Sequence, residues 1–546
     1  MSEKGALDFS PRPLRPSRLN YGKYAILIIA AAFWLVYVSA QRQASRVSPL
    51  SDCAQVPPVL PTTLPELDEH LKSSAFRNTS IARLSNSVKI YTPSFDDLGP
   101  VGEDPRWDVF PPFAAYLNAT FPRLHTALTV EHVNTHGLLY TWAGSDDALK
   151  PILFMAHQDV VPVPDATIPD WTYPPFSGAY DGKFIWGRGA SDDKSQLIAT
   201  LSALEALLDA GFSPQRTILV ALGIDEESMG LQGAGKMGPF LLERYGPDAL
   251  AAIVDEGAGF VQKWGTTLAL PGIAEKGYLD VQIVVRTLGG HSSIPPAHTG
   301  IGVMSKLIVA LENEPYHPEI SAENPITTLL TCGAAHGDDF PKKLRRLLKV
   351  GKKQVLAHEV AKDPQAKYLI TTAQSVTVIN GGIKANALPE KVIANINYRV
   401  NIGSTTDSVK HKLEGITRRI AKQHNMTVVP ISESAPGTIS ILYHSALEPA
   451  PVSPTEGPVW SLIAGTTRAL YGEEVIVAGG HMTGNTDTKY FWPLTKHIFR
   501  FGMGWDGSSE GMGNIHTVDE RASVAGHLNA IRWISMFVRN ADAAEL

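Results

Sequence analysis

Three apolar runs in the first half of the chain each end abruptly in polar residues. They cover residues 152–157, 216–224 and 250–254, and each has the length of a strand. None alternates between apolar and polar side chains as a half-exposed strand would, so each run predicts a strand that is buried on both faces. Open α/β sheets bind ligands at the carboxyl ends of such strands. We therefore expect a buried sheet with a polar site along one edge.

Acidic residues or a histidine follow every one of these runs, and a further acidic pair begins a helix predicted over residues 197–208. One such pair alone would be ordinary, because acidic residues cap helices and favour the N-terminal dipole. Four sets converging on one edge of a sheet would repel one another unless cations neutralised them. The pattern therefore predicts a metal cluster, with candidate ligands His157 with Asp159, Asp192 with Asp193, Glu226 with Glu227, and Asp255 with Glu256.

From residue 276 the pattern changes to alternating strands and amphipathic helices. Strands are predicted over 277–286, 375–379 and 392–400, helices over 302–313 and 408–424, and a charged helical insertion over 318–372. This mixture is typical of an α+β domain with helices on one face of an antiparallel sheet. We expect it to occupy 276–435, between two parts of an α/β catalytic domain at 66–275 and 436–546.

Residues 24–40 form an uncharged apolar stretch near the start of the chain. As a helix at ~1.5 Å per residue they would span about 25 Å, slightly less than a typical hydrocarbon core. Five basic residues precede the stretch, namely Lys4, Arg12, Arg15, Arg18 and Lys23. This bias predicts a cytoplasmic tail over 1–23, a transmembrane signal-anchor, a stalk over 41–65 and a lumenal body, as in a single-pass type II membrane protein.

A cleaved signal peptide remains the alternative to the anchor. The sequence Val38-Ser39-Ala40 resembles a signal-peptidase site, in which case the protein would be secreted. Three glycosylation acceptors, Asn78, Asn118 and Asn425, agree with a body on the non-cytosolic side in either case.

Charge and cysteine content narrow the class of protein. The 546 residues carry a formal net charge of −6, with no basic footprint for nucleic acid. The only cysteines, Cys53 and Cys332, could form one disulfide, but neither has the spacing of a thiolate zinc site.

Several motifs together resemble one enzyme family. In chain order they are His157-x-Asp159, Gly187-Arg-Gly-Ala-x-Asp192-Asp193-Lys194, Glu226-Glu227, Asp255-Glu256-Gly257, Gly290-His291-Ser-Ser and His516. From about residue 150 to its end the chain resembles the di-zinc metallopeptidase family of aminoacylase, glutamate carboxypeptidase and carboxypeptidase S. The N-terminal stretch, stalk and insertion are most similar to the carboxypeptidase S branch, which includes a vacuolar Gly-X carboxypeptidase of fungi. The resemblance implies a mixed sheet flanked by helices, with an inserted lid and dimerisation domain.

The resemblance also implies ligands for two Zn²⁺ ions per subunit. Each ion would have three protein ligands and a shared water, which is the open coordination that a catalytic zinc requires. The implied ligands are His157 and Asp255 for one ion, Glu227 and His516 for the other, and Asp192 as the bridge. The carboxylate that binds the same ion as His157 differs by one position among relatives. Glu256 therefore remains the alternative, and we favour Asp255.

Three catalytic roles follow from the same resemblance. Asp159 would accept a hydrogen bond from His157 and fix the tautomer of its ring. Glu226 would be the general base for the water that the two ions share. His291 of the lid would polarise the scissile carbonyl, often in the site of a neighbouring subunit.

These residues predict an enzyme that hydrolyses the peptide bond before a free C-terminal amino acid. Asn386 and Arg399 would hold the substrate, with Arg399 binding its α-carboxylate through two hydrogen bonds. One alternative is the hydrolysis or condensation of N-acyl amino acids, and another is a catalytically inactive, membrane-anchored binding protein. The vacuole as compartment and a homodimer formed through the lid are implied by the resemblance alone.

Overall fold

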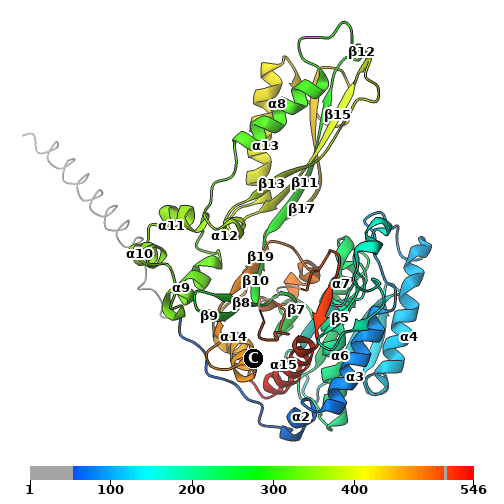
Figure 1. The fold of residues 1–546 in the computed structure, drawn as a ribbon, viewed down its shortest axis with the longest axis vertical. Helices are drawn as coiled ribbons and strands as arrows, with labels where there is room; N and C mark the ends of the chain where they lie inside the picture. Colours follow the sequence, from blue (N-terminus) through cyan, green and yellow to red (C-terminus); the bar gives the residue numbers. More distant parts are fainter. Residues whose placement is uncertain (1–52, 509–512) are drawn as a thin grey trace, which may run out of the picture.

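The computed structural model describes residues 53–508 and 513–546 of the chain (Figure 1). The apolar stretch 24–40, the predicted tail and the first part of the predicted stalk lie outside the described residues. Among the residues that are described, no helix is long and apolar enough to cross a membrane. They form a large α/β body, a lid that projects from it, and a group of short helices beside the junction.

An eight-stranded mixed sheet runs through the body, and the three predicted apolar runs form its parallel centre. The strand β3 (Ile152–His157) lies between β6 (Ile218–Gly223) and β7 (Ala252–Ala258), parallel to both. The carboxyl ends of these strands therefore meet at one edge, as the sequence predicts. The outer strands are β1 (Thr129–Val133) and β2 (Gly137–Trp142) beyond β6, and β20 (Ile498–Phe501), β10 (Gly272–Glu275) and β19 (Gly480–Met482) beyond β7.

Helices cover both faces of this sheet, which explains why its central strands are apolar throughout. Leu153 of β3 packs in a core with α7 (Ala234–Tyr245). Its neighbour Phe154 packs in the core on the other face, which includes α6 (Lys194–Asp209), α14 (Gly457–Tyr471) and α15 (Val524–Asp542). Because successive strand residues point to opposite faces, a strand covered on both sides has no polar positions. The predicted α/β class with a mixed sheet is confirmed.

Short helices and small sheets complete the body. The N-terminal helices are α2 (Pro65–His70), α3 (Ser74–Val88), α4 (Phe110–Thr120) and α5 (Pro122–Ala127). Five 3-10 turns are η1 (Pro105–Val109), η2 (Asp165–Asp170), η3 (Glu226–Ser228), η4 (Asp487–Tyr490) and η5 (Trp492–Leu494). Two small sheets consist of β4 (Ala179–Tyr180), β5 (Phe184–Trp186) and β21 (Arg521–Ser523), and of β8 (Phe260–Lys263), β9 (Thr266–Ala269) and β18 (Ile476–Val477).

The lid is a five-stranded, mostly antiparallel sheet with two helices, as the alternating pattern predicts. Its strand order is β13 (Ala373–Gly381), β15 (Lys391–Val400), β11 (Gly277–Arg286), β17 (Thr438–Leu447) and β16 (Thr427–Val428). The helices α8 (Gly300–Asn313) and α13 (Thr406–Gln423) share its apolar core, and β12 (Gly290–His291) pairs with β14 (Ala387–Leu388) at the far end. Because β17 continues to Leu447, the lid sheet extends beyond residue 435, where the sequence suggested its end.

The two connections between body and lid touch each other. The first enters the lid at Gly277 and the second leaves it after Leu447. A Cβ atom at Gly277 would lie 2.4 Å from the carbonyl oxygen of Leu447 and 2.7 Å from the nitrogen of Pro449. Only glycine leaves room for backbones this close, so the lid stands on two connections in direct contact.

The predicted insertion folds as the helices α9 (Ile326–His336), α10 (Lys342–Val350), α11 (Lys353–Val360) and α12 (Pro364–Leu369). Cys53 forms a disulfide with Cys332 of α9. The residues after Cys53 then follow the body: Gln55 accepts the N–H of Val477 at 2.8 Å, and the N–H of Val59 donates to Gly465 at 3.0 Å. This part of the predicted stalk is therefore bound to the body rather than extended away from it.

We predict that replacing Cys53 or Cys332 by serine lowers the free energy of unfolding by about 2–4 kcal/mol, the usual contribution of a native disulfide. The reason is that the bond joins residues 279 positions apart, so the unfolded chain gains freedom when it is lost. Chemical denaturation followed by tryptophan fluorescence measures the change. Both single variants and the double variant should lose the same amount, since all three lack one bond. A single variant as stable as the wild type would contradict the prediction.

Candidate metal centre

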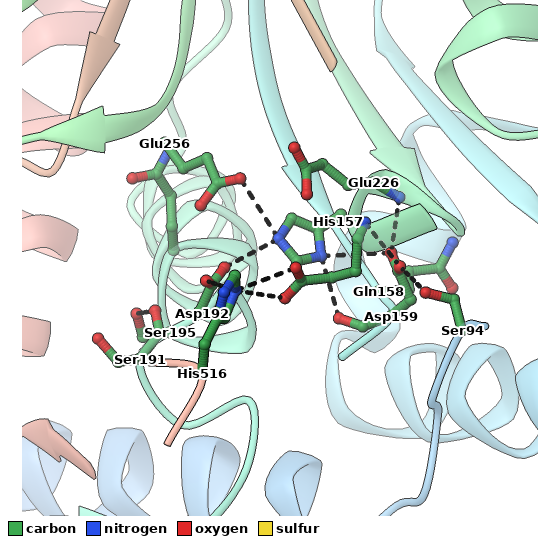
Figure 2. Close-up of polar contacts among 12 residues, drawn as sticks. Ser94, His157, Gln158, Asp159, Ser191, Asp192, Ser195, Glu226, Glu256 and His516 are labelled. Atoms are coloured by element: carbon green, nitrogen blue, oxygen red, sulfur yellow. Dashed lines mark hydrogen bonds and ion pairs between the residues drawn. The ribbon is translucent and has the colours of Figure 1, made fainter. Parts of the chain in front are cut away.

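The predicted polar residues meet where β3, β6 and β7 end (Figure 2). His157 is the last residue of β3, Glu226 begins η3 after β6, and Glu256 lies in β7. Asp192 precedes α6, and His516 lies on the loop before β21. Three neighbouring strands and two loops thus converge on one cluster of imidazole and carboxylate groups.

Asp192 lies between two histidines. Its Oδ1 is 3.1 Å from Nε2 of His157, and its Oδ2 is 3.1 Å from Nε2 of His516. Each histidine also faces a glutamate: Oε1 of Glu256 is 3.3 Å from Nε2 of His157, and Oε2 of Glu227 is 3.0 Å from Nε2 of His516. Two half-sites, each with one histidine and one glutamate, therefore share one aspartate.

The donor atoms are close enough together to hold metal ions. One atom each from His157, Asp192 and Glu227 lies within 4.8 Å of the others, and the same is true of His157, Glu226 and Glu256. Imidazole nitrogen and carboxylate oxygen are donors that zinc accepts. The residues present thus fit a divalent metal ion.

Glu256, and not the predicted Asp255, faces His157. Neighbouring residues on a strand point to opposite faces, so only one of the two can reach the cluster. Asp255 is buried beside the ion pair of Glu275 with Arg500, where burial raises its pKa to about 6. The geometry therefore favours the alternative ligand, Glu256.

Asp159 connects His157 to the segment that carries the two glutamates after β6. Its Oδ1 lies 3.2 Å from Nδ1 of His157, and the same Nδ1 donates to the carbonyl oxygen of Asp159 at 3.0 Å. Its carboxylate also accepts the N–H groups of Glu226 and Glu227, each at 3.2 Å, and the hydroxyl of Ser94 at 2.6 Å. Ser94 could not be predicted, because nothing in the sequence connects a single serine to a motif 65 residues later in the chain.

Glu520 fixes the loop that carries Asp192. One carboxylate oxygen accepts the N–H groups of Ser191 at 3.0 Å and Asp192 at 3.1 Å, and the other accepts a hydrogen bond from Arg188. Glu520 is fully buried and follows His516 by four residues, so it also ties the His516 loop to Asp192. The sequence assigns Glu520 no role, and only its closeness to the predicted ligand His516 could have indicated one.

The cluster concentrates negative charge with little compensation from basic side chains. Among the described residues, no lysine or arginine forms an ion pair with Asp192, Glu226, Glu227 or Glu256. Burial and the Asp192 carboxylate raise the pKa of Glu256 to about 8, and burial and the Glu256 carboxylate raise that of Glu226 well above its usual value. Hydrogen bonds to Asp192 and Glu227 raise the pKa of His516 to about 10. Bound cations would relieve this repulsion.

The remaining predicted residues lie in the lid, outside the cluster. Arg399 is near the base of the lid, where its Nη1 donates to Oδ1 of Asn485 at 3.1 Å. His291 and Asn386 come together at the opposite end, in and beside the β12–β14 pair, and both are exposed (Figure 1). Within one chain, His291 is therefore not brought to the candidate metal centre.

His481 has a structural contact in place of a catalytic one. It is buried, its Nε2 donates to the carbonyl of Leu369 at 2.8 Å, and burial lowers its pKa to about 4. It therefore links β19 to the end of the insertion. The predicted glycosylation acceptors Asn78, Asn118 and Asn425 are all exposed.

Residues 153–540 match the family model described as peptidase family M20/M25/M40. The chain belongs to this family. It is 41% identical over 512 residues to carboxypeptidase S of Saccharomyces cerevisiae, covering 90% of this chain and 89% of that protein. It is 32% identical over 469 residues to the N-fatty-acyl-amino acid synthase/hydrolase PM20D1 of Mus musculus, covering 84% and 87%. The predicted family is confirmed.

Solved structures share this M20 fold. The di-peptidase Dug1p of Saccharomyces cerevisiae superposes with a TM-score of 0.62 at 13% identity, covering 88% of this chain and 99% of that chain. Human carnosine dipeptidase 1 superposes with a TM-score of 0.61 at 14% identity, covering 89% and 100%. At these identities the two structures support the fold alone.

We predict that Glu520→Gln weakens zinc binding about 10–100-fold, the usual effect of removing a group that orients a metal ligand. A glutamine can accept through only one atom, so either Arg188 or the backbone of Asp192 loses its partner. Competition with a chromogenic chelator measures the affinity.

Asp519→Asn is the matched control for this variant. Asp519 precedes Glu520 and accepts hydrogen bonds from Thr172, at 2.7 Å from its nitrogen and 2.8 Å from its hydroxyl, so the change leaves the Asp192 backbone untouched. A folded Glu520→Gln protein that binds zinc as tightly as this control would refute the positioning role.

Proposed function

We propose that this chain is a di-zinc carboxypeptidase that hydrolyses the bond before the C-terminal amino acid of small peptides. Membership of the M20 family makes it a metallopeptidase, and its 41% identity to a carboxypeptidase S supports the carboxypeptidase activity. The observation that carries the proposal is the Asp192 carboxylate, with one oxygen 3.1 Å from each of two histidines. A carboxylate that presents one oxygen to each half-site is the arrangement expected of a ligand that bridges two ions.

The proposed ligands follow the two half-sites. His157 and Glu256 would hold one zinc ion, Glu227 and His516 the other, and Asp192 both. Each ion then has three protein ligands, which is the open set expected of a catalytic zinc. Zinc ions bound here would lower the pKa of a water molecule and polarise a carbonyl group.

Glu226 is the proposed general base. Its backbone N–H is held by Asp159, and its side chain lies in the same group of donor atoms as His157 and Glu256. It is positioned to take a proton from the attacking water and to pass it to the amine that leaves. The low polarity that raises its pKa in the free protein also strengthens its interaction with a nearby water.

Arg399 is the proposed binding group for the carboxylate of the substrate. It lies on β15 at the end of the lid near the body, half-buried, and only one of its guanidinium nitrogens makes a hydrogen bond to the side chain of Asn485. The rest of its planar fork suits a carboxylate. Such a group would select substrates with a free C-terminus.

The lid supports a further proposal, that two chains pair as a homodimer. β13 is an edge strand of the lid sheet, with Val378 and Ile379 exposed on it and the apolar Val309 exposed on α8. Long exposed edge strands with apolar side chains tend to pair with another chain. His291 and Asn386, remote from their own centre, could then serve the centre of the partner chain.

The cellular location is proposed from the sequence. Residues 24–40 would anchor the chain with its body in the lumen, and the resemblance to the carboxypeptidase S branch favours the vacuole. The exposure of Asn78, Asn118 and Asn425 is consistent with glycosylation there. Secretion after cleavage remains the alternative.

Glu226→Gln should lower kcat by about 10²–10⁴-fold, the contribution of a positioned general base, because the amide cannot accept the proton. The zinc content should stay at the wild-type value, since Glu226 is not among the proposed ligands. Steady-state hydrolysis of Gly-Leu and elemental analysis measure the two quantities. The exposed Glu103→Gln serves as control, and a full-rate Glu226→Gln enzyme would remove Glu226 from the mechanism.

Glu256→Ala should lose one zinc ion per chain, whereas Asp255→Ala should keep both. The reason is that only the Glu256 carboxylate faces His157. Zinc is counted in the folded fraction of each variant after gel filtration, which separates loss of metal from loss of fold. If instead Asp255→Ala loses a zinc ion while folded and Glu256→Ala does not, the assignment is reversed.

A pair of substrates separates the two activities found among the relatives. We expect turnover of Gly-Leu, whereas an enzyme similar in activity to PM20D1 would release leucine only from an N-fatty-acyl leucine. Turnover of the acyl amide alone would reject the carboxypeptidase.

Gly-Leu amide tests the role of Arg399. The wild-type enzyme should bind it more weakly than Gly-Leu, with KM raised about 10–100-fold for the loss of one charged hydrogen-bonded contact. In Arg399→Ala the two KM values should converge. A preference for the free acid that survives in this variant would place the carboxylate elsewhere.

A further inference from the structure

The helices α10 and α11 of the insertion carry a charge opposite to that of the whole chain. Residues 342–360 hold seven lysines and arginines and one glutamate, whereas the 546 residues together have a formal net charge of −6. A basic stretch can bind nucleic acid, but the net negative charge of the whole protein makes this partner a poor fit. A local partner with negative charge would complement these two helices.

Most of these basic side chains form no ion pair with the described part of the chain. Lys343 pairs with Glu359 at 2.7 Å, and Arg345 donates to the carbonyls of Ala334 and Gly337. The other five are exposed and form no ion pair with the residues that the structure describes: Lys342, Arg346, Lys349, Lys352 and Lys353.

Two apolar side chains are exposed among them. Val350, at the end of α10, is 55% exposed, and Val355, in the first turn of α11, is 48% exposed. The opposite side of α10 is anchored, because Leu347 and Leu348 are buried in the core of the insertion. We call the five unpaired basic residues with Val350 and Val355 the insertion surface. Basic residues around exposed apolar ones are typical of a surface that lies on lipid headgroups.

The start of the described chain is attached to the same insertion. Cys53 is joined by its disulfide to Cys332 of α9, and Nε2 of His336 donates to the carbonyl of Cys53 at 2.9 Å. The helix α9 in turn shares its core with α10. Cys53 also packs against Leu268 and Ile476 of the body, so the chain that leads back to the apolar stretch 24–40 joins the described residues where the insertion meets the body.

The segment between the apolar stretch and Cys53 is short. Residues 41–52 separate the apolar stretch from Cys53. Even fully extended they span no more than about 45 Å. If residues 24–40 cross a membrane, Cys53 and the insertion bonded to it are held within that distance of the membrane surface.

We propose that the insertion surface lies on the anionic headgroups of the membrane that holds residues 24–40. The inference rests on the anchor proposed above and adds a second contact to it. Lysines and arginines are attracted to an anionic surface, so five of them would fix the orientation of a body that one helix alone would leave free to rotate. The Cys53–Cys332 bond would keep anchor and surface on the same side of the molecule.

Lysine acetylation of the full chain tests the proposal. The chain is placed in nanodiscs of phosphatidylcholine, with or without phosphatidylserine, and acetylation of each lysine is followed by mass spectrometry. Phosphatidylserine should slow the acetylation of Lys349, Lys352 and Lys353 about fivefold or more, as about 1 kcal/mol per contact implies. Lys422, exposed on α13 of the lid, should not change. Equal rates in the two lipids at all four lysines would overturn the proposal.

A charge-reversed variant separates this contact from unspecific attraction. In the triple variant Lys349→Glu, Lys352→Glu, Lys353→Glu, the protection of the remaining Lys342 should be lost. The matched control reverses three exposed lysines far from the insertion, Lys89, Lys236 and Lys422, and should keep the protection of Lys349, Lys352 and Lys353. Loss of protection in the control variant would contradict a specific surface.

Failure of the anchor gives a different result from failure of the surface. A chain without an anchor will not enter nanodiscs, and it is then mixed with preformed vesicles of the same two compositions. Flotation with phosphatidylserine vesicles alone, abolished in the triple variant, would reject the anchor and support the surface. Flotation with neither composition would reject both.

Discussion

The carboxylate of Asp192, shared between His157 and His516, is the contact on which the rest of the site depends. It draws together a strand end, a helix start and a loop that follows both by more than 300 residues. Around it, carboxylates repel one another, and burial together with this repulsion raises the pKa values of Glu256 and Glu226. Divalent cations bound at this edge of the sheet would neutralise the carboxylates and offset their repulsion.

The fold is arranged to hold these groups in place without neutralising them. Parallel strands covered on both faces bring His157, Glu226 and Glu256 to one edge. Behind the cluster, Glu520 holds the backbone of Asp192, and Asp159 holds the backbone of Glu226 and Glu227 as well as the ring of His157. The ligand side chains are thereby fixed in orientation but remain available to ions, which is the condition for a metal site that is ready before it is filled.

Much of the fold could be predicted because the central strands are uninterrupted apolar runs, and the lid strands alternate. The choice between Asp255 and Glu256 could not be predicted. When both faces of a strand are apolar, the sequence does not show which of two neighbouring residues points to which face. Glu520 was missed because it binds backbone groups, which any sequence offers. The contact of residues 53–64 with the body was missed because a proline-rich segment has the same composition whether free or bound.

Zinc stoichiometry is the most direct test of a shared cluster. Isothermal titration of the metal-free, folded chain with zinc should show two ions bound per chain, and Asp192→Ala should weaken the binding of both at once, since each half-site uses one of its oxygens. Binding of a single ion by the wild type, or an Asp192→Ala protein that still binds two ions with unchanged affinity, would contradict the account.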